Sequence, residues 1–262
     1  MSWDDFIYFA LPASILWLAA GSMACLGKGR NNTLIDALML GGTLIFGAYI
    51  LLLWRALERP PMRTMGETRL WYSFFLAFIG HIAYKRWNYN WLLFFSAALA
   101  TVFAGVNLFK PEIHSKALMP ALQSAYFVPH VTVYILSYAM LGVAAIGALA
   151  QIRKTGRGQP DNTLYGVIDN LVYIGFGFLA LGMISGALWA KEAWGHYWSW
   201  DPKETWAFIT AAGYLIYIHM RLRKTRPLLT LWVLPVSFIL LMICWLGVSY
   251  LPSAQSSIHV YS

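Results

Sequence analysis

Long apolar runs dominate this sequence and restrict the chain to folds that a lipid bilayer can hold. Hydrophobic residues make up 59% of the 262 residues and charged residues 11%. The averages for soluble globular domains are roughly 45–50% and 25%. A water-soluble fold cannot hide so much apolar side chain behind so few charges. We therefore predict an all-α, polytopic integral membrane protein.

Runs long enough to cross a bilayer occur about eight times, since a spanning helix needs about 20 apolar residues. The runs at 69–85 and 206–222 are the weakest, one short and aromatic and the other marginal in length. No repeat or linker divides the chain, which predicts a single membrane domain over 1–262. The expected spans are 6–27, 34–54, 69–85, 91–109, 129–151, 167–190, 206–222 and 228–250.

The basic residues indicate the orientation of these spans. Eleven fall on one side and eight on the other, and the richer side is expected to be cytoplasmic. Both termini and the longer connections then face the outer side of the membrane. The net charge of +8 is scattered between apolar runs, which is typical of membrane loops and gives no nucleic-acid surface. Cys25 and Cys244 lie inside apolar runs and form no metal or disulfide pattern.

Tryptophan is concentrated in one predicted outer segment. Five of the 13 Trp residues fall between positions 189 and 206, where an even distribution would place about one. One interpretation is an interfacial aromatic belt. The other is a flat platform for a large planar apolar ligand, with Trp194, Trp198 and Asp201 on one face at helical spacing. The residues alone leave both open.

Two nearby patterns have structural interpretations. Asp201, Pro202 and Glu204 occupy the N-cap, N1 and N3 positions expected at the start of a helix. Gly182 and Gly186 form a GxxxG pair, for which close helix packing is favoured over room for a ring edge.

The six histidines separate by depth. His130 lies at the outer mouth of the fifth span and His259 in the outer tail, so together they suggest a bis-imidazole clamp for haem iron. His219 and His81 lie inside spans. Trp206 and His219 are separated by about 20 Å of helix, so an inner site would be distinct from the outer one. His114 and His196 lie in outer segments.

The run Trp194-Gly-His-Tyr-Trp-Ser-Trp-Asp-Pro-Lys-Glu-Thr-Trp-Ala207 closely resembles the WWD signature of haem-handling cytochrome c assembly proteins. Its ending resembles the CcsA/ResC family, the System II cytochrome c synthetase subunits. Shorter pieces are similar to the same family: Leu118–Ser124 before His130, Ile168–Tyr173, Ser185–Ala190 and Ile258–Tyr261.

The resemblance implies a function and a set of residues. It implies that haem b is bound transiently and presented for covalent attachment to the CxxCH motifs of apocytochrome c, a haem-lyase activity shared with a ResB/CcsB partner. A thioredoxin-like protein would keep the substrate thiols reduced. The implied iron ligands are His130 and His259 outside and His219 within the membrane, with His81 as a reserve. The residues expected to bind haem in or beside the 191–206 loop are Trp194, Tyr197, Trp198, Trp200, Asp201 and Trp206.

Two other functions compete with this one. A haem delivery protein of the CcmC type would bind haem without ligase activity, although the Pro202–Trp206 ending counts against it. A b-type cytochrome anchor would hold permanent haem between histidines of facing spans. Only His81 and His219 could serve, and the Trp loop would then have no role.

Overall fold

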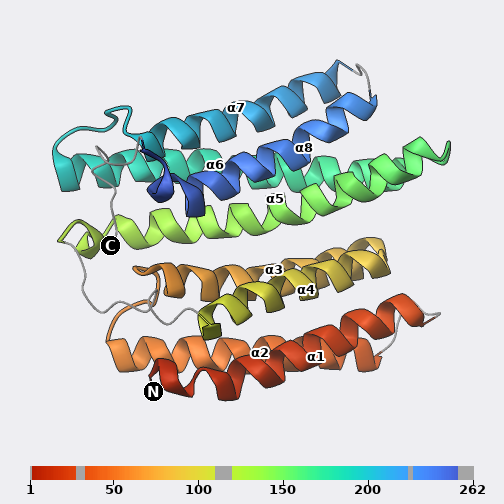
Figure 1. Ribbon diagram of the computed structural model, residues 1–262, viewed down its shortest axis with the longest axis horizontal. Coiled ribbons are helices and arrows are strands. Elements are labelled where there is room, and N and C mark those ends of the chain that lie inside the picture. Colours follow the sequence, from red (N-terminus) through yellow and green to blue (C-terminus); the bar gives the residue numbers. More distant parts are fainter. Residues whose placement is uncertain (1, 28–32, 110–119, 224–226, 253–262) are drawn as a thin grey trace. The chain divides into compact units, whose positions relative to one another are not determined.

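The computed structural model describes residues 2–27, 33–109, 120–223 and 227–252, which form helices and turns without any strand (Figure 1). The prediction of an all-α polytopic membrane protein is confirmed. The helices divide into two compact units, Met1–Leu118 and Met119–Ser262. The single membrane domain over 1–262 stays a prediction.

The described part of the N-terminal unit contains four helices after a short 3₁₀ turn, Trp3–Asp5. Helix α1 packs against α2 and α4, and α3 packs against α4 (Figure 1). Small residues allow these approaches: a Cβ on Gly21 of α1 would lie 2.8 Å from the Cα of Phe94. The helices are α1 (Ile7–Leu26), α2 (Thr33–Leu57), α3 (Met65–Trp87) and α4 (Asn90–Phe109).

Four α-helices also lie in the described ranges of the C-terminal unit. Helix α5 packs along α6 and against α8, which in turn packs against α7 (Figure 1). A 3₁₀ turn, Pro120–Gln123, precedes them, and a π-helical turn, Ile243–Gly247, and a 3₁₀ turn, Val248–Tyr250, follow them. The helices are α5 (Phe127–Gly156), α6 (Asn162–Trp194), α7 (Pro202–Leu222) and α8 (Pro227–Met242).

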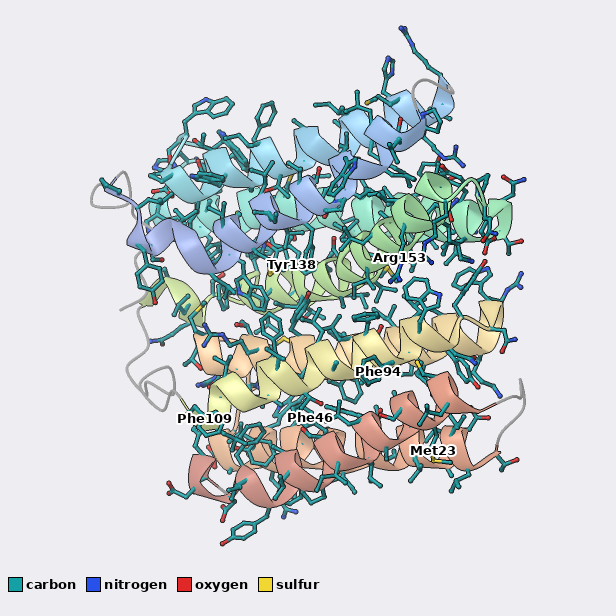
Figure 2. All side chains as sticks on the ribbon, turned by 45° about the vertical axis from the view of Figure 1, so that its right-hand side comes forward. Met23, Phe46, Phe94, Phe109, Tyr138 and Arg153 are labelled. Atoms are coloured by element: carbon teal, nitrogen blue, oxygen red, sulfur yellow. The ribbon has the colours of Figure 1, made fainter. Side chains whose placement is uncertain are left out.

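The distribution of side chains suits a lipid environment. Phe46 is fully buried within its unit (Figure 2). Large apolar side chains such as Leu44, which is 71% exposed, point outward. Many buried positions carry alanine, including Ala13, Ala20 and Ala24 of α1. Large apolar residues outside and small ones between helices are typical of membrane bundles, because lipid solvates the outer surface.

Within the described residues, six helical segments are long and apolar enough to cross a membrane: Trp3–Leu26, Thr33–Leu57, Asn90–Phe109, Phe127–Gly156, Asn162–Trp194 and Pro227–Tyr250. The two remaining predicted spans form helices α3 and α7, which are too polar to be counted with those six. Eight crossings and the orientation of the termini therefore stay predictions. Helix α6 has 33 residues, about 50 Å, which exceeds the roughly 30 Å hydrocarbon core, so it extends beyond the core.

Candidate functional site

The Trp-rich segment, residues 191–206, contains an irregular connection between two helices. Helix α6 ends at Trp194 because Gly195 adopts a left-handed conformation (φ 86°) and donates its N–H to the carbonyl of Lys191. The next helix begins at Pro202. The expectation that Trp194, Trp198 and Asp201 share a helical face is wrong, since residues 195–201 are not helical.

Trp200 holds a strained position in this connection. Its φ of 59° lies in the left-handed region, which is uncommon for a bulky side chain, and 62% of the residue is exposed. Its ring meets those of Trp198 and Phe208 edge to face, with centroids 5.8 and 5.7 Å away. The exposed aromatic surface is therefore stepped, because Trp198 and Trp200 are nearly perpendicular.

The acidic residues of the segment hold its shape. Asp201 is buried, and its carboxylate accepts the N–H of Lys203 at 2.9 Å. Glu204 Oε2 accepts the N–H groups of Ser199 and Asp201 at 2.8 and 3.1 Å. This capping box confirms the helix-start interpretation. It also fixes the backbone on both sides of Trp200.

The other members of the segment differ in exposure. Tyr197 is 55% exposed, and the Lys191 ammonium lies over its ring at 5.4 Å. Trp206 is half-buried in the first turn of α7. His196 is exposed in the connection.

Lys203 contacts the π-helical turn that follows α8. Its carbonyl accepts a hydrogen bond from Cys244 Sγ, at 3.7 Å, in the π-helical turn. Burial lowers the pKa of the Lys203 ammonium to about 8, although Cys244 and Asp201 oppose this shift.

His130 lies in the first turn of α5, and α6 holds its imidazole. Nδ1 lies 2.8 Å from the carbonyl oxygen of Gly182, which can only accept, so Nδ1 is the protonated nitrogen in this contact. The ring stacks on that of Trp189, with centroids 5.5 Å apart and 23° between planes. Iron coordination by His130 would therefore use Nε2.

The GxxxG pair receives aromatic side chains of α5. A Cβ on Gly186 would lie 2.6 Å from His130 Cε1, and one on Gly182 would lie 2.6 Å from Tyr134 Cδ1. The favoured interpretation, close packing, therefore holds. The pair also makes room for ring edges, and those rings belong to α5.

Trp189 joins His130 to the Trp-rich segment. It is 2% exposed, its Nε1 donates to the Ala121 carbonyl at 2.8 Å, and its ring meets that of Trp194 at 4.8 Å. Sequence reasoning counted Trp189 in the cluster but missed it as a site residue. Its spacing from Gly182 and Gly186 (i, i+4, i+7) is the signal that could have identified it.

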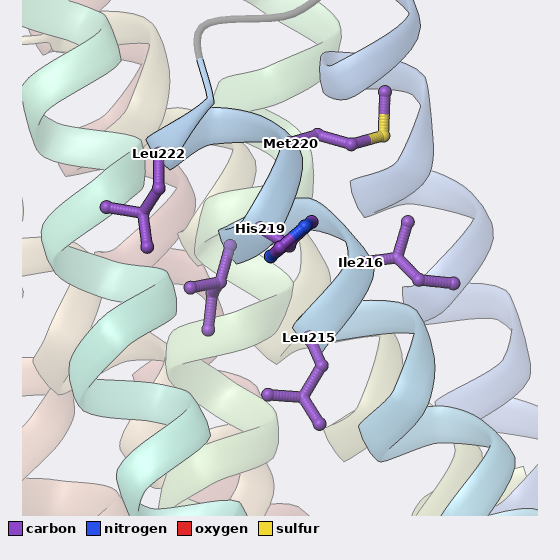
Figure 3. Close-up of a pocket in the computed structure, with 6 residues that line it drawn as sticks. Leu215, Ile216, His219, Met220 and Leu222 are labelled. Carbon is purple, nitrogen blue, oxygen red and sulfur yellow. The ribbon is translucent and has the colours of Figure 1, made fainter.

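His219 lies on the outward face of α7, away from the bundle. It is exposed in an open hollow of about 430 Å³ lined otherwise by apolar side chains of the same helix (Figure 3). The His219 carbonyl accepts the N–H of Arg223 at 3.0 Å, and the described residues give its imidazole no hydrogen bond or ion pair. The side chains that line this hollow are Leu215, Ile216, Ile218, His219, Met220 and Leu222.

Two ion-pair clusters lie near the predicted inner ends of the helices. His81 Nε2 is 2.9 Å from Asp36 Oδ1, and Lys85 Nζ is 2.7 Å from Asp36 Oδ2, which links α3 to α2. This contact engages one of the two ring nitrogens of His81, the reserve ligand. In the other unit, Asp169 accepts from Tyr217 at 2.7 Å and Arg221 at 2.9 Å, which links α6 to α7.

The structure thus brings His130 close to part of the Trp-rich segment and leaves His219 apart on α7. His259 and His114 lie outside the described residues. No group of three or more His, Cys, Asp or Glu side chains within the described ranges could hold a metal ion. The opposite iron ligand that the resemblance implies, His259, therefore stays a prediction.

Comparison with known proteins defines the class. The family model described as "Cytochrome C assembly protein" matches residues 62–254, which contain α3, α4 and all the described helices of the C-terminal unit. The chain therefore belongs to the family of cytochrome c assembly proteins, and its role lies in cytochrome c maturation.

The relatives are similar to this chain over different lengths. The cytochrome c biogenesis protein CcsA of Chlamydomonas reinhardtii is 41% identical over 166 residues, 58% of this chain and 45% of the relative. CcsA of Mesostigma viride is 33% identical over 88% of this chain and 90% of the relative. CcsA of Prochlorococcus marinus is 30% identical over 86% and 84%. The chain thus spans less than half of the Chlamydomonas relative. The predicted resemblance to the CcsA/ResC family is confirmed.

Proposed function

We propose that this chain receives haem and presents it on the outer side of a bacterial inner membrane for covalent attachment to apocytochrome c. The observation that carries the proposal is the continuous contact from His130 through Trp189 to Trp194. An oriented imidazole thereby lies beside an aromatic segment whose Trp200 is exposed and strained. This combination suits a planar iron porphyrin that must be bound and later released.

His130 is suited to bind iron through Nε2. The Gly182 carbonyl accepts the Nδ1 proton, which sets the tautomer and makes the ring a stronger ligand. In the proposal His259 supplies the opposite axial ligand. Asp201 would act through the backbone that it caps. The residues proposed to bind haem are those that the resemblance implies: Trp194, Tyr197, Trp198, Trp200, Asp201 and Trp206.

The chemistry that follows is an addition. Each thiol of a CxxCH segment adds across a haem vinyl group: sulfur bonds to one vinyl carbon and the hydrogen goes to the other, with no net oxidation. The protein's contribution is mainly to position the reacting pair. The thiols must be reduced, which a thioredoxin-like partner would ensure. The histidine of CxxCH would then displace one axial imidazole.

His219 provides a second, inner binding point in this proposal. Its imidazole stands in an apolar hollow on the outward face of α7 (Figure 3). Lipid would leave this polar ring without a hydrogen-bond partner, which is costly, so a ligand or another chain should cover it. We assign it to haem on its way outward, with a ResB/CcsB-type subunit supplying the second ligand.

An optical spectrum of the detergent-purified protein tests the outer site. We expect low-spin, six-coordinate haem in the wild type, its loss in His130→Ala and in His259→Ala, and its recovery with added imidazole. His196→Ala is the matched control, because His196 is exposed in the same region and is not an expected ligand. Haem binding that neither His130→Ala nor His259→Ala alters would refute the outer clamp.

A second experiment separates attachment from delivery. The chain and a ResB-type subunit are expressed with an apocytochrome in a host that lacks a cytochrome c assembly system. Covalent cytochrome c, dependent on both His130 and the substrate cysteines, is expected. Bound haem without covalent product would favour the CcmC-type alternative. Haem sensitive only to His81 and His219 variants would favour the b-type cytochrome anchor.

A further inference from the structure

A stripe of three rings runs along the first half of α5 and begins at His130. His130, Tyr134 and Tyr138 are spaced four residues apart, so they share one face of the helix. The ring centroid of Tyr134 lies 4.7 Å from that of His130, with 74° between the planes, and 5.4 Å from that of Tyr138. Because packed side chains leave little free space, a shift of one ring is passed to the next.

Tyr134 contacts both His130 and the glycine that holds it. A Cβ on Gly182 would lie 2.6 Å from Tyr134 Cδ1, and the carbonyl of the same glycine accepts the Nδ1 proton of His130 at 2.8 Å. The Ser137 hydroxyl donates to the Gly175 carbonyl at 2.7 Å, which ties the next turn of α5 to α6. On the α6 side, helix backbone therefore supports the rings and can yield little.

Trp245 adds a fourth ring at the far end of this stripe. It belongs to the π-helical turn Ile243–Gly247 that follows α8, and its ring centroid lies 5.6 Å from that of Tyr138. Such turns are rare and are frequent at functional sites. The rings of His130, Tyr134, Tyr138 and Trp245 thus form a continuous ring column that links α5 to the end of α8.

The π-helical turn is itself anchored at the start of α7. Cys244, the neighbour of Trp245, donates from Sγ to the Lys203 carbonyl at 3.7 Å. The Lys203 N–H in turn donates to the Asp201 carboxylate at 2.9 Å. The same turn therefore contacts the ring column through one residue and the Trp-rich segment through the next.

We propose that Trp245 is a positioning residue for His130. Its ring keeps Tyr138 and Tyr134 packed against the imidazole, so that Nε2 holds the direction in which it binds iron. Orienting the ligand before haem arrives lowers the cost of binding. This inference rests on the proposed function, in which His130 binds haem iron.

A haem titration of the detergent-purified protein, followed by its optical spectrum, tests the assignment. Trp245→Leu should weaken haem binding about tenfold, the lower end of the loss seen when a group that orients a metal ligand is removed. Low-spin haem should decrease and return with added imidazole. Trp245→Phe should stay close to the wild type, because it keeps a ring beside Tyr138. Trp232→Leu is the matched control, since Trp232 is 47% exposed on α8 and should bind haem as the wild type does.

A double variant separates positioning of His130 from general damage to the helix bundle. With imidazole present, His130→Ala and His130→Ala/Trp245→Leu should bind haem equally, because the side chain that Trp245 orients is gone from both. If Trp245→Leu still lowers haem affinity in this background, it acts by another route and the inference is wrong.

The results that overturn the inference differ from those that overturn the proposed function. Wild-type haem affinity and spectrum in Trp245→Leu, with haem still lost in His130→Ala, would overturn the inference alone. Equal losses in Trp245→Leu and Trp232→Leu would also overturn it, since both tryptophans would then act as anchors in the lipid. A wild-type protein that binds no haem overturns both proposals.

Discussion

Gly186→Ala should disturb the outer histidine without removing any polar group. The new Cβ would lie 2.6 Å from Cε1 and 2.8 Å from Nδ1 of His130, about 0.8 and 0.6 Å short of an ordinary contact. The imidazole must shift or rotate by a comparable amount, because the neighbouring backbone of α6 cannot move easily. Its 2.8 Å hydrogen bond to the Gly182 carbonyl would lengthen or break.

The magnitude follows from these contacts. A lost hydrogen bond costs about 1 kcal/mol, and overpacking costs about 1–3 kcal/mol. Loss of a group that orients a metal ligand typically lowers metal affinity by about 10–100-fold. We therefore expect haem affinity to fall within that range, with the low-spin spectrum restored by added imidazole.

The assay is a haem titration of the detergent-purified protein, followed by its optical spectrum. Gly177→Ala is the matched control: it lies on the same helix, gains the same helix propensity and places its Cβ in open space. Wild-type haem affinity in Gly186→Ala would refute the reasoning. So would an equal loss in Gly177→Ala, since that would point to the helix and not to His130.

Three further predictions concern stability and pH. Asp201→Ala should lower the free energy of unfolding by about 0.5–2 kcal/mol, because it removes the N-cap of α7, and the melting temperature in detergent should fall. Asp201→Asn should keep most of the wild-type stability, since asparagine also caps helices. Equal melting temperatures of Asp201→Ala and the wild type would contradict the capping role. Asp169→Asn should destabilise the protein by about 1–2 kcal/mol, which is less than for a fully buried ion pair because solvent screens this part-exposed one. In a thermal melt, the double variant with Arg221→Gln should recover part of the lost stability. Lys203→Met should stabilise the protein most near pH 7. Because the folded-state pKa of about 8 lies below the unfolded value, the folded chain loses this proton first, and wild-type stability gains on the variant as pH rises from 8 towards 10. A stability difference that is the same at pH 7 and pH 10 would exclude this effect.

Helix positions were largely predictable because hydrophobic length is a local property. The eight predicted runs coincide with α1 to α8, and α3 and α7, with their extra charges, are the two that fall short as membrane spans. The helix start at Asp201 was equally local, since an N-cap and its N3 partner are three residues apart.

The geometry of the Trp-rich segment was less predictable. Helical spacing placed Trp194 and Trp198 on one face, but Gly195 ends the helix between them. A glycine can continue a helix or end it, and the outcome depends on packing around the ends. The perpendicular rings of Trp198 and Trp200 likewise depend on a left-handed backbone that the residue types do not favour.

The sequence by itself determined that this chain is a helical membrane protein of the cytochrome c assembly family, because apolar run length and a rare aromatic motif need no long-range contact to be read. Only the tertiary structure decided that Gly182 and Trp189 hold His130, since these residues lie more than 50 positions away on another helix. It also decided that Asp169 of α6 pairs with Tyr217 and Arg221 of α7. Such pairings depend on how side chains meet in three dimensions, and spacing along the chain does not encode that directly.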